Sequence, residues 1–157
     1  MLKPFFESDR NFESLKAELR SWKGTPNRPR MFEKGVGVDC VNFVHRSCYN
    51  IGALPMVTFP RYVTRGGGPQ TLTLMRDVIL GIRNVRAVWA EGMNENPVNL
   101  VQRGDMIVIS SGKALHHLII AEELPNVWHC FKEVDQGSIM DTIVLNHLKN
   151  IFRIYDR

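Results

Sequence analysis

The most informative segment of the sequence for the fold is Gly37-Val38-Asp39-Cys40-Val41-Asn42-Phe43-Val44. Apolar residues continue at helical spacing on one face of this segment, at Val41, Val44, Cys48 and Ile51. Gly52 follows them and can adopt the left-handed conformation that commonly ends a helix. The pattern predicts a helix from Asp39 to Asn50 with Cys40 in its first turn. Unpaired N–H groups and the helix dipole at that end favour a thiolate, so we expect Cys40 to have a lowered pKa and to act as a nucleophile.

Short β-rich runs dominate the chain after Gly104. They are separated by turn residues and span Met106 to Ile109, His117 to Ala121, Val127 to Phe131, Ser138 to Val144 and Ile151 to Tyr155. Near the start of the chain, Asn11 can cap a helix over residues 11–23 whose apolar stripe is Phe12, Leu15, Leu19 and Trp22. Helices first and strands afterwards predict an α+β domain, in which the helix that carries Cys40 packs against an antiparallel five-stranded sheet.

A long connection, residues 53–100, joins the Cys40 helix to these strands. Three prolines and the run Gly66 to Gly68 give its first part a loop composition. A helix is predicted near 71–83, with an apolar stripe of Leu72, Met75, Ile79 and Ile82. The chain has 157 residues, of which 44% are hydrophobic and 23% charged, so we expect residues 1–157 to form a single domain with its own core.

Two histidines on successive predicted strands could serve a cysteine nucleophile. His117 and His129 are twelve residues apart, with a turn around 123–126 between them, so an antiparallel hairpin would bring the imidazoles side by side if both point from the same face. Acyl transfer needs a group that accepts and returns a proton, and an imidazole held by a polar partner supplies both steps. We therefore predict that His117 is the base and that His129 orients it.

Composition excludes several classes of function. The net charge is +4, but the basic residues are scattered and do not alternate with aromatic residues, which argues against nucleic-acid binding. No run approaches the roughly 20 apolar residues of a membrane-spanning helix, and Met1 to Asp9 lacks the apolar core of a secretory signal. We therefore expect a chain made in the cytoplasm without stable membrane insertion. Of the three cysteines, Cys48 and Cys130 are predicted to lie in the core.

Several blocks in order resemble the NlpC/P60 family of papain-like cysteine peptidases. The segment around Cys40 resembles the family's Asp-Cys-Ser-Gly-Phe-Val nucleophile motif. Further blocks are Gln102-Arg103-Gly104-Asp105-Met106-Ile107, His117-Leu118-Ile119-Ile120 and Val127-Trp128-His129-Cys130, which resemble its Pro-Gly-Asp-Leu, His-Val-Gly-Ile and Ile-His-Ala blocks. Trp22-Lys23-Gly24-Thr25-Pro26 and Phe152-Arg153-Ile154 resemble members encoded near phage tail genes. The Leu-Ile-Ile that follows His117 favours it over His116, since neighbouring strand residues face opposite ways and only one can address Cys40.

The resemblance implies a papain-like fold and a cell-wall hydrolase. Cys40, His117 and His129 would then be the catalytic residues, acting through an acyl-enzyme on amide bonds of peptidoglycan stem peptides or related small peptides, without a metal or an organic cofactor. It also implies a phage particle or another export route as a means of delivery. Asn27 stands where the family has a Tyr, Asn42 where it has Gly or Ser, and Ile119 where it has Gly. We expect the substrate to contact Asn27, Asp39, Asn42 and His116.

Three alternatives stay open. The same Cys and His could serve a papain-like amidase, thioesterase or acyltransferase with another substrate. Asn27, Asn42 and Ile119 could instead mark a catalytically decayed binding or structural module of a phage tail. A zinc site made of Cys40, His117, His129 and Cys130 is disfavoured, because none of the close ligand pairs of structural zinc sites is present.

Overall fold

A computed structural model describes residues 1–59, 75–110 and 116–157 of the chain. The first part contains η1 (Phe5–Glu7), α1 (Asp9–Ser21), β1 (Phe32–Glu33), β2 (Gly37–Val38) and α2 (Cys40–Asn50). The later parts contain a helical segment over 75–80, then β3 (Val85–Ala90), α4 (Pro97–Leu100), β4 (Met106–Ser110), β5 (His116–Ala121), β6 (Asn126–Cys130), β7 (Val134–Ser138), α5 (Thr142–His147) and β8 (Leu148–Ile154). Over these ranges no helix has the length and apolar character needed to cross a membrane.

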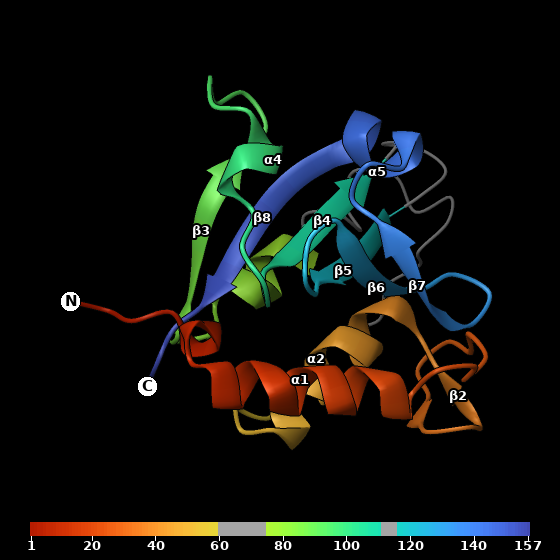
Figure 1. Cartoon of the computed structure of the whole chain (residues 1–157). Helices are drawn as coiled ribbons and strands as arrows, with labels where there is room; N and C mark the ends of the chain where they lie inside the picture. The colour runs from red at the N-terminus through yellow and green to blue at the C-terminus, as the bar shows by residue number, and fades with distance from the viewer. Residues whose placement is uncertain (60–74, 111–115) are drawn as a thin grey trace.

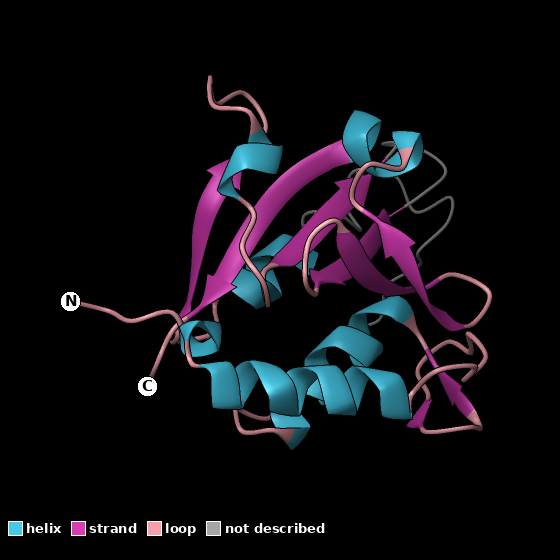
Figure 2. Cartoon of the chain, in the orientation of Figure 1, coloured by secondary structure: helices cyan, strands magenta, loops and turns pink. Residues whose placement is uncertain are grey.

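The main sheet has six strands in the order β3-β8-β4-β5-β6-β7, and every neighbouring pair is antiparallel. The helices α1 and α2 lie together on one side of this sheet (Figure 1), with α2 packed on β5 and β6. Helices and strands are coloured separately in Figure 2, which shows the same division between a helical layer and a strand layer. The predicted α+β class, with the Cys40 helix against an antiparallel sheet, is confirmed.

The predicted count of five strands is wrong, because β3 was missed. It lies inside the predicted connection and gains its hydrogen bonds from β8, more than sixty residues later in the chain. The predicted strand from Ser138 to Val144 is also wrong. Strand β7 ends at Ser138, and Asp141 then caps α5 by accepting a hydrogen bond from the backbone N–H of Ile143 at 2.9 Å. A carboxylate at this position satisfies an orphan helix donor and so favours a helix start.

Both long helices begin at a polar cap. Helix α1 starts after Ser8 and not at the predicted Asn11, and its predicted apolar stripe is buried. Helix α2 starts after Asp39, whose Oδ1 accepts a hydrogen bond from Asn42 N at 2.9 Å. Gly52 closes α2 with φ +79°, as its position predicted. Of the helix predicted near 71–83, Leu72 lies outside the described residues, whereas the other three residues of its stripe, Met75, Ile79 and Ile82, are buried.

Two separate cores lie on the two faces of the sheet. The core on the α2 face is formed by side chains from α1, α2 and the even-numbered positions of the central strands, including Phe43, Val108, Leu118, Ile120, Trp128 and Phe152. The core on the opposite face is formed by odd-numbered positions with residues of α5, including Ile107, Ile109, Ile119, Val127, Val144 and Ile151. Side chains alternate along a strand, so a difference of one residue in β5 decides to which core a side chain belongs.

Candidate active site

Cys40 is the first residue of α2 and is completely buried. Burial raises the pKa of its thiol to about 12, and the charges of Asp39 and Cys130 act in the same direction. Hydrogen bonds to the backbone at Leu118 and Val41 lower the pKa, but by less. The predicted lowering of the Cys40 pKa is therefore wrong, because desolvation of the thiolate outweighs the helix N-terminus.

The thiol sits against strand β5 close to where β5 and β6 stop pairing. These strands pair at Ile120–Trp128 and Ala121–Val127. Beyond the last pair, the backbone of Leu118 is hydrogen-bonded to the Cys40 thiol. On the neighbouring strand, Cys130 Sγ donates to the carbonyl of Val38 at 3.4 Å. The buried Cys130, predicted as a core residue, belongs to the core on the α2 face. The backbone of β5 next to His117 is thus the part of the sheet that meets the candidate nucleophile.

The structure brings the imidazoles of His117 and His129 together. Their ring centroids are 5.9 Å apart with the planes at 68°, and Phe131 stacks on His117 at 4.1 Å between centroids. Burial, with a smaller contribution from His129, lowers the pKa of His117 to about 3. Burial also lowers the pKa of His129, while Asp135 and Asp141 oppose the shift. His117 Nε2 and His129 Nδ1 are buried and find no hydrogen-bond partner among the described residues.

The two neighbouring histidines of β5 face opposite ways. His117 pairs with Ile109 and shares a face with Ile119, so its side chain lies on the face opposite α2. His116 shares the α2 face with Leu118. Its Nδ1 lies 2.9 Å from Ser110 Oγ on the facing strand, and its Nε2 is buried without a partner in the described part of the chain. Among the described residues, neither the His116 nor the His117 imidazole is hydrogen-bonded to Cys40. The thiol therefore contacts strand β5 but has no hydrogen bond to a base there.

The four residues predicted to contact substrate form the frame around Cys40. Asn27 Nδ2 donates to the carbonyl of Cys130 at 3.1 Å, which fixes the loop before β1 to the end of β6. Asp39 Oδ2 accepts from Arg30 N and from Asn42 Nδ2, both at 2.9 Å. His116 is fully buried. The Asn27 and Asp39 contacts hold the segments before and around Cys40 in place.

Sequence reasoning missed two residues of this region, Ser110 and Phe131. Ser110 faces His116 because β4 and β5 pair in register as far as these two residues, and the sequence gave no way to fix that register beforehand. Phe131 follows β6 directly and stacks on His117. Its place two residues after His129 on the same predicted strand was the available signal, since alternate residues share a face.

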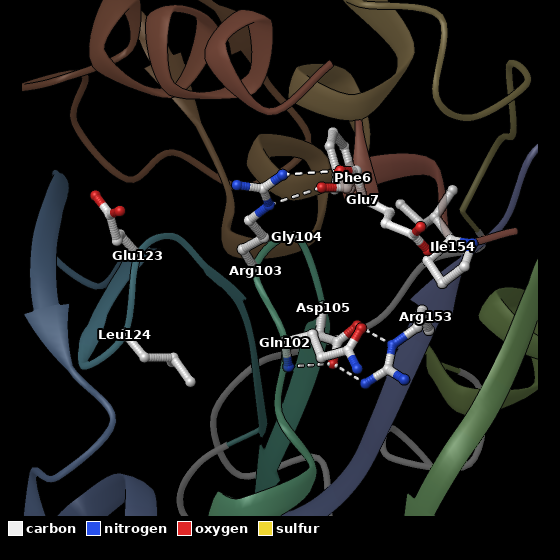
Figure 3. Close-up of a pocket in the computed structure, with 11 residues that line it drawn as sticks. Phe6, Glu7, Gln102, Arg103, Gly104, Asp105, Glu123, Leu124, Arg153 and Ile154 are labelled. Carbon is white, nitrogen blue, oxygen red and sulfur yellow. Dashed lines mark hydrogen bonds and ion pairs between the residues drawn. The ribbon is translucent and has the colours of Figure 1, made fainter. Parts of the chain in front are cut away.

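A separate cavity of about 440 Å³ lies at the other end of β4 and β5 (Figure 3). Asp105 and Arg153 form a buried ion pair at its wall, with Nη2 to Oδ2 at 2.7 Å and Nε to Oδ1 at 2.9 Å. Asp105 Oδ2 also accepts from Gln102 N at 2.8 Å, which stabilises the turn before β4. Burial raises the pKa of Asp105 even though Arg153 opposes the shift. The described residues that line this cavity include no cysteine or histidine.

Metal-ligating side chains do not cluster around Cys40. Within residues 1–59, 75–110 and 116–157, no three His, Cys, Asp or Glu side chains are arranged to hold a metal ion. His117 and His129 lie on the face opposite α2, whereas Cys130 lies on the α2 face. The four residues considered for zinc are therefore divided between the two faces of the sheet.

No family model and no curated protein matches the sequence. Solved structures do match, and they define a class: the chain has the NlpC/P60 fold, as the sequence blocks indicated. A lipoprotein-like NLP/P60 family protein from Staphylococcus aureus superposes with a TM-score of 0.63 at 16% identity, over 96% of this chain and 43% of that protein. The chain thus spans less than half the length of that neighbour.

Two mycobacterial neighbours are of particular interest. The peptidoglycan hydrolase RipB from Mycobacterium tuberculosis superposes with a TM-score of 0.56 at 16% identity, over 95% of this chain and 67% of that protein. RipD from the same organism superposes with a TM-score of 0.53 at 14% identity, over 91% and 95% of the two chains. RipD is described as a non-catalytic NlpC/p60 domain protein adapted to peptidoglycan binding. The same fold therefore occurs in proteins with and without catalysis.

Proposed function

We propose that this protein is a cysteine hydrolase that cleaves amide bonds in peptidoglycan stem peptides through an acyl-enzyme on Cys40. The observation that carries the proposal is the position of Cys40 at the start of α2, hydrogen-bonded to the backbone of β5 beside His117, whose imidazole contacts His129. The fold supports the same conclusion by likeness, since RipB is a peptidoglycan hydrolase. Delivery with a phage tail or by another export route stays a prediction.

The resting site holds a neutral thiol and a neutral imidazole, since the pKa of Cys40 is raised to about 12 and that of His117 lowered to about 3. His117 lies on the sheet face opposite α2, so the reaction requires its imidazole to move within reach of Cys40 Sγ when substrate binds. His117 then takes the thiol proton while Cys40 Sγ attacks the amide carbonyl. The imidazolium then protonates the leaving amine as the C–N bond breaks, which leaves a thioester on Cys40. His117 next removes a proton from water, the hydroxide attacks the thioester, and the thiol returns. His129 positions His117 through these steps.

One observation favours a second function, which is peptidoglycan binding without catalysis. Cys40 has no exposed surface, and within the described residues no imidazole is hydrogen-bonded to it. RipD provides a neighbour with this fold that is described as non-catalytic. In that function, the frame made by Asn27, Asp39 and Asn42 would hold a stem peptide without cleaving it. A papain-like amidase, thioesterase or acyltransferase would share the chemistry of the first proposal but not its substrate.

The test is hydrolysis of purified peptidoglycan stem peptides, followed by mass spectrometry for a pair of fragments that together gain one water. We expect the wild-type protein to produce such fragments and Cys40→Ala to lose at least about 10³-fold in rate, since the nucleophile is gone. Cys48→Ala is the matched control, because Cys48 is buried in the same helix. No cleavage by the wild type, with retained binding to insoluble peptidoglycan, would overturn the hydrolase proposal and support the binding module.

A further inference from the structure

Two of the three free cysteines, Cys40 and Cys130, lie where strands β5 and β6 stop pairing. The Cys40 thiol is hydrogen-bonded to the backbone of Leu118 on β5. Cys130 is the last residue of β6, and its Sγ donates to the carbonyl of Val38, two residues before Cys40. Both cysteines belong to the core on the α2 face and have no exposed surface. The start of α2 and the end of β6 are therefore held against the same part of β5.

The strand register supports the closeness of the two thiols. Strands β5 and β6 pair at Ile120–Trp128, and two residues further along each strand the same register sets Leu118 against Cys130. Cys130 thus faces the residue whose backbone is hydrogen-bonded to the Cys40 thiol. A charge on Cys130 also raises the pKa of Cys40, which agrees with a short separation because such an effect weakens with distance.

We propose that Cys40 and Cys130 form a reversible disulfide when the protein meets a small peroxide, and that this bond switches off the candidate nucleophile. The disulfide itself is independent of the proposed function, and only the loss of cleavage rests on it. A disulfide requires Cα atoms about 4.4–6.8 Å apart. One thiol bonds to β5 and the other bonds to the segment just before α2, so both residues lie at the contact between the helix start and the strands.

The oxidation balances with one molecule of hydrogen peroxide. The thiolate sulfur of one cysteine attacks the O–O bond, which leaves a sulfenic acid on that cysteine and releases hydroxide, which becomes water on taking up a proton. The thiolate of the second cysteine then attacks the sulfenic sulfur, the S–O bond breaks, and a second hydroxide leaves and is protonated to water. The two thiols lose two electrons and two protons in total, and the peroxide is reduced to two molecules of water. A dithiol reductant reverses the step by thiol–disulfide exchange.

Burial favours this product over its competitors. Both thiols are fully buried, and their pKa values are raised to about 12, so at neutral pH they are protonated and react slowly. An oxidant as large as oxidised glutathione is excluded from them, whereas hydrogen peroxide is close to water in size. Cys48 lies eight residues further along α2, which is about 12 Å along the helix axis, so it does not compete for an oxidised Cys40.

The experiment treats the reduced wild-type protein with hydrogen peroxide in mildly alkaline buffer, blocks the remaining thiols with iodoacetamide after unfolding, and maps the peptides by mass spectrometry. We expect a peptide pair joined through Cys40 and Cys130 that has lost two hydrogen atoms and is separated by dithiothreitol. The oxidised protein should cleave stem peptides at least about tenfold more slowly than the reduced protein, and dithiothreitol should restore the rate.

Two variants control the assignment. Cys130→Ser keeps a hydroxyl that can donate to Val38, and it should abolish the disulfide and make the loss of cleavage irreversible, because Cys40 is then oxidised beyond the sulfenic acid. Cys48→Ala, the matched control in the same helix, should form the disulfide as the wild type does. Circular dichroism of both variants separates a lost bond from a lost fold.

The outcomes separate this inference from the proposed function. Oxygen added to Cys40 without a Cys40–Cys130 peptide pair, or a disulfide through Cys48, would overturn the inference and leave the hydrolase standing. Native protein whose thiols stay unmodified, under conditions that oxidise the unfolded chain, would overturn it as well. If the disulfide forms but the reduced protein cleaves nothing, the disulfide stands and the hydrolase is overturned. Cleavage at an unchanged rate by the fully oxidised protein would contradict the switch.

Discussion

Both faces of the main sheet carry buried histidines, but these histidines have different surroundings. The α2 face holds Cys40, Cys130 and His116, all completely buried, and His116 is bound to Ser110. The opposite face holds His117 and His129, and His129 lines a pocket of about 190 Å³. Within the described ranges, His117 Nε2 and His129 Nδ1 have no hydrogen-bond partner. Burial suppresses charge on both faces, since the pKa of the Cys40 thiol is raised and those of the three histidines are lowered.

The two faces differ in what surrounds their buried imidazoles. On the α2 face, whose core contains Phe43 and Trp128, His116 Nδ1 is paired with Ser110 Oγ, but His116 Nε2 has no partner in the described part of the chain. On the opposite face, His129 lines a pocket of about 190 Å³, and its Nδ1 has no partner among the residues that the structure describes. Cys40 contacts the strand between the two faces through the backbone of Leu118. The face on which the base lies is therefore the question that experiments must answer.

The largest effect is expected from separate replacement of the two neighbouring histidines. His117→Ala should lower the rate of stem-peptide cleavage by about 10²- to 10⁴-fold, because it removes the proposed proton acceptor. His116→Ala should lower it less than about tenfold, since His116 lies on the packed face. The measurement is kcat/KM for both variants, with Tm as a check on folding. The reverse ranking would move the base to the α2 face, with Ser110 as its partner.

Part of the fold and of the candidate site could be predicted from local sequence patterns. The apolar spacing of α2 and the glycine that ends it stand close together in the sequence, and both predictions were confirmed. Strand β3 was not predictable in this way because its hydrogen bonds come from β8 at the far end of the chain. The closeness of His117 and His129 followed from strand alternation, whereas the face they occupy depended on the tertiary position of α2. The raised pKa of Cys40 depends on burial, which sequence does not show.

Stability should depend more strongly on the α2 face than on the pocket face. Phe43 is fully buried between α1 and the sheet and meets Trp22 edge to face, so Phe43→Ala should cost about 3–5 kcal/mol in the free energy of unfolding. Phe131 is only partly buried, and Phe131→Ala should cost distinctly less while it lowers cleavage by loosening His117. Urea unfolding and kcat/KM of both variants test this. Equal losses of stability would contradict the division between the faces.

A pH effect of intermediate size follows from the buried His117. Its pKa is 6.5 in the unfolded chain and about 3 in the folded protein, so between these values the unfolded state binds one more proton. The stability that His117 contributes by remaining neutral is complete above pH 6.5 and is lost as the pH falls toward 3. At pH 5 the loss is about 2 kcal/mol in order of magnitude. His117→Asn should flatten the dependence of unfolding free energy on pH between 7 and 4.

His147→Asn provides the matched control, since His147 ends the short helix α5 and lies outside both clusters. It should leave the pH dependence close to that of the wild type. A slope that His117→Asn does not change would show that the imidazole meets water in solution. In that case the face opposite α2 is more open than its burial indicates, and proton transfer from Cys40 would have a solvated acceptor.

The smallest effect is expected from Ser110→Ala. This variant tests directly whether His116 on the α2 face takes part in catalysis. The Ser110 Oγ to His116 Nδ1 contact of 2.9 Å satisfies one nitrogen of a fully buried ring. Its removal should destabilise the protein by about 1–2 kcal/mol, because a buried polar atom loses its partner. If the α2 face serves packing alone, kcat/KM should change less than about threefold. A tenfold loss at unchanged KM, restored by Ser110→Thr, would mean that Ser110 positions a catalytic His116 and that proton transfer takes place on the α2 face.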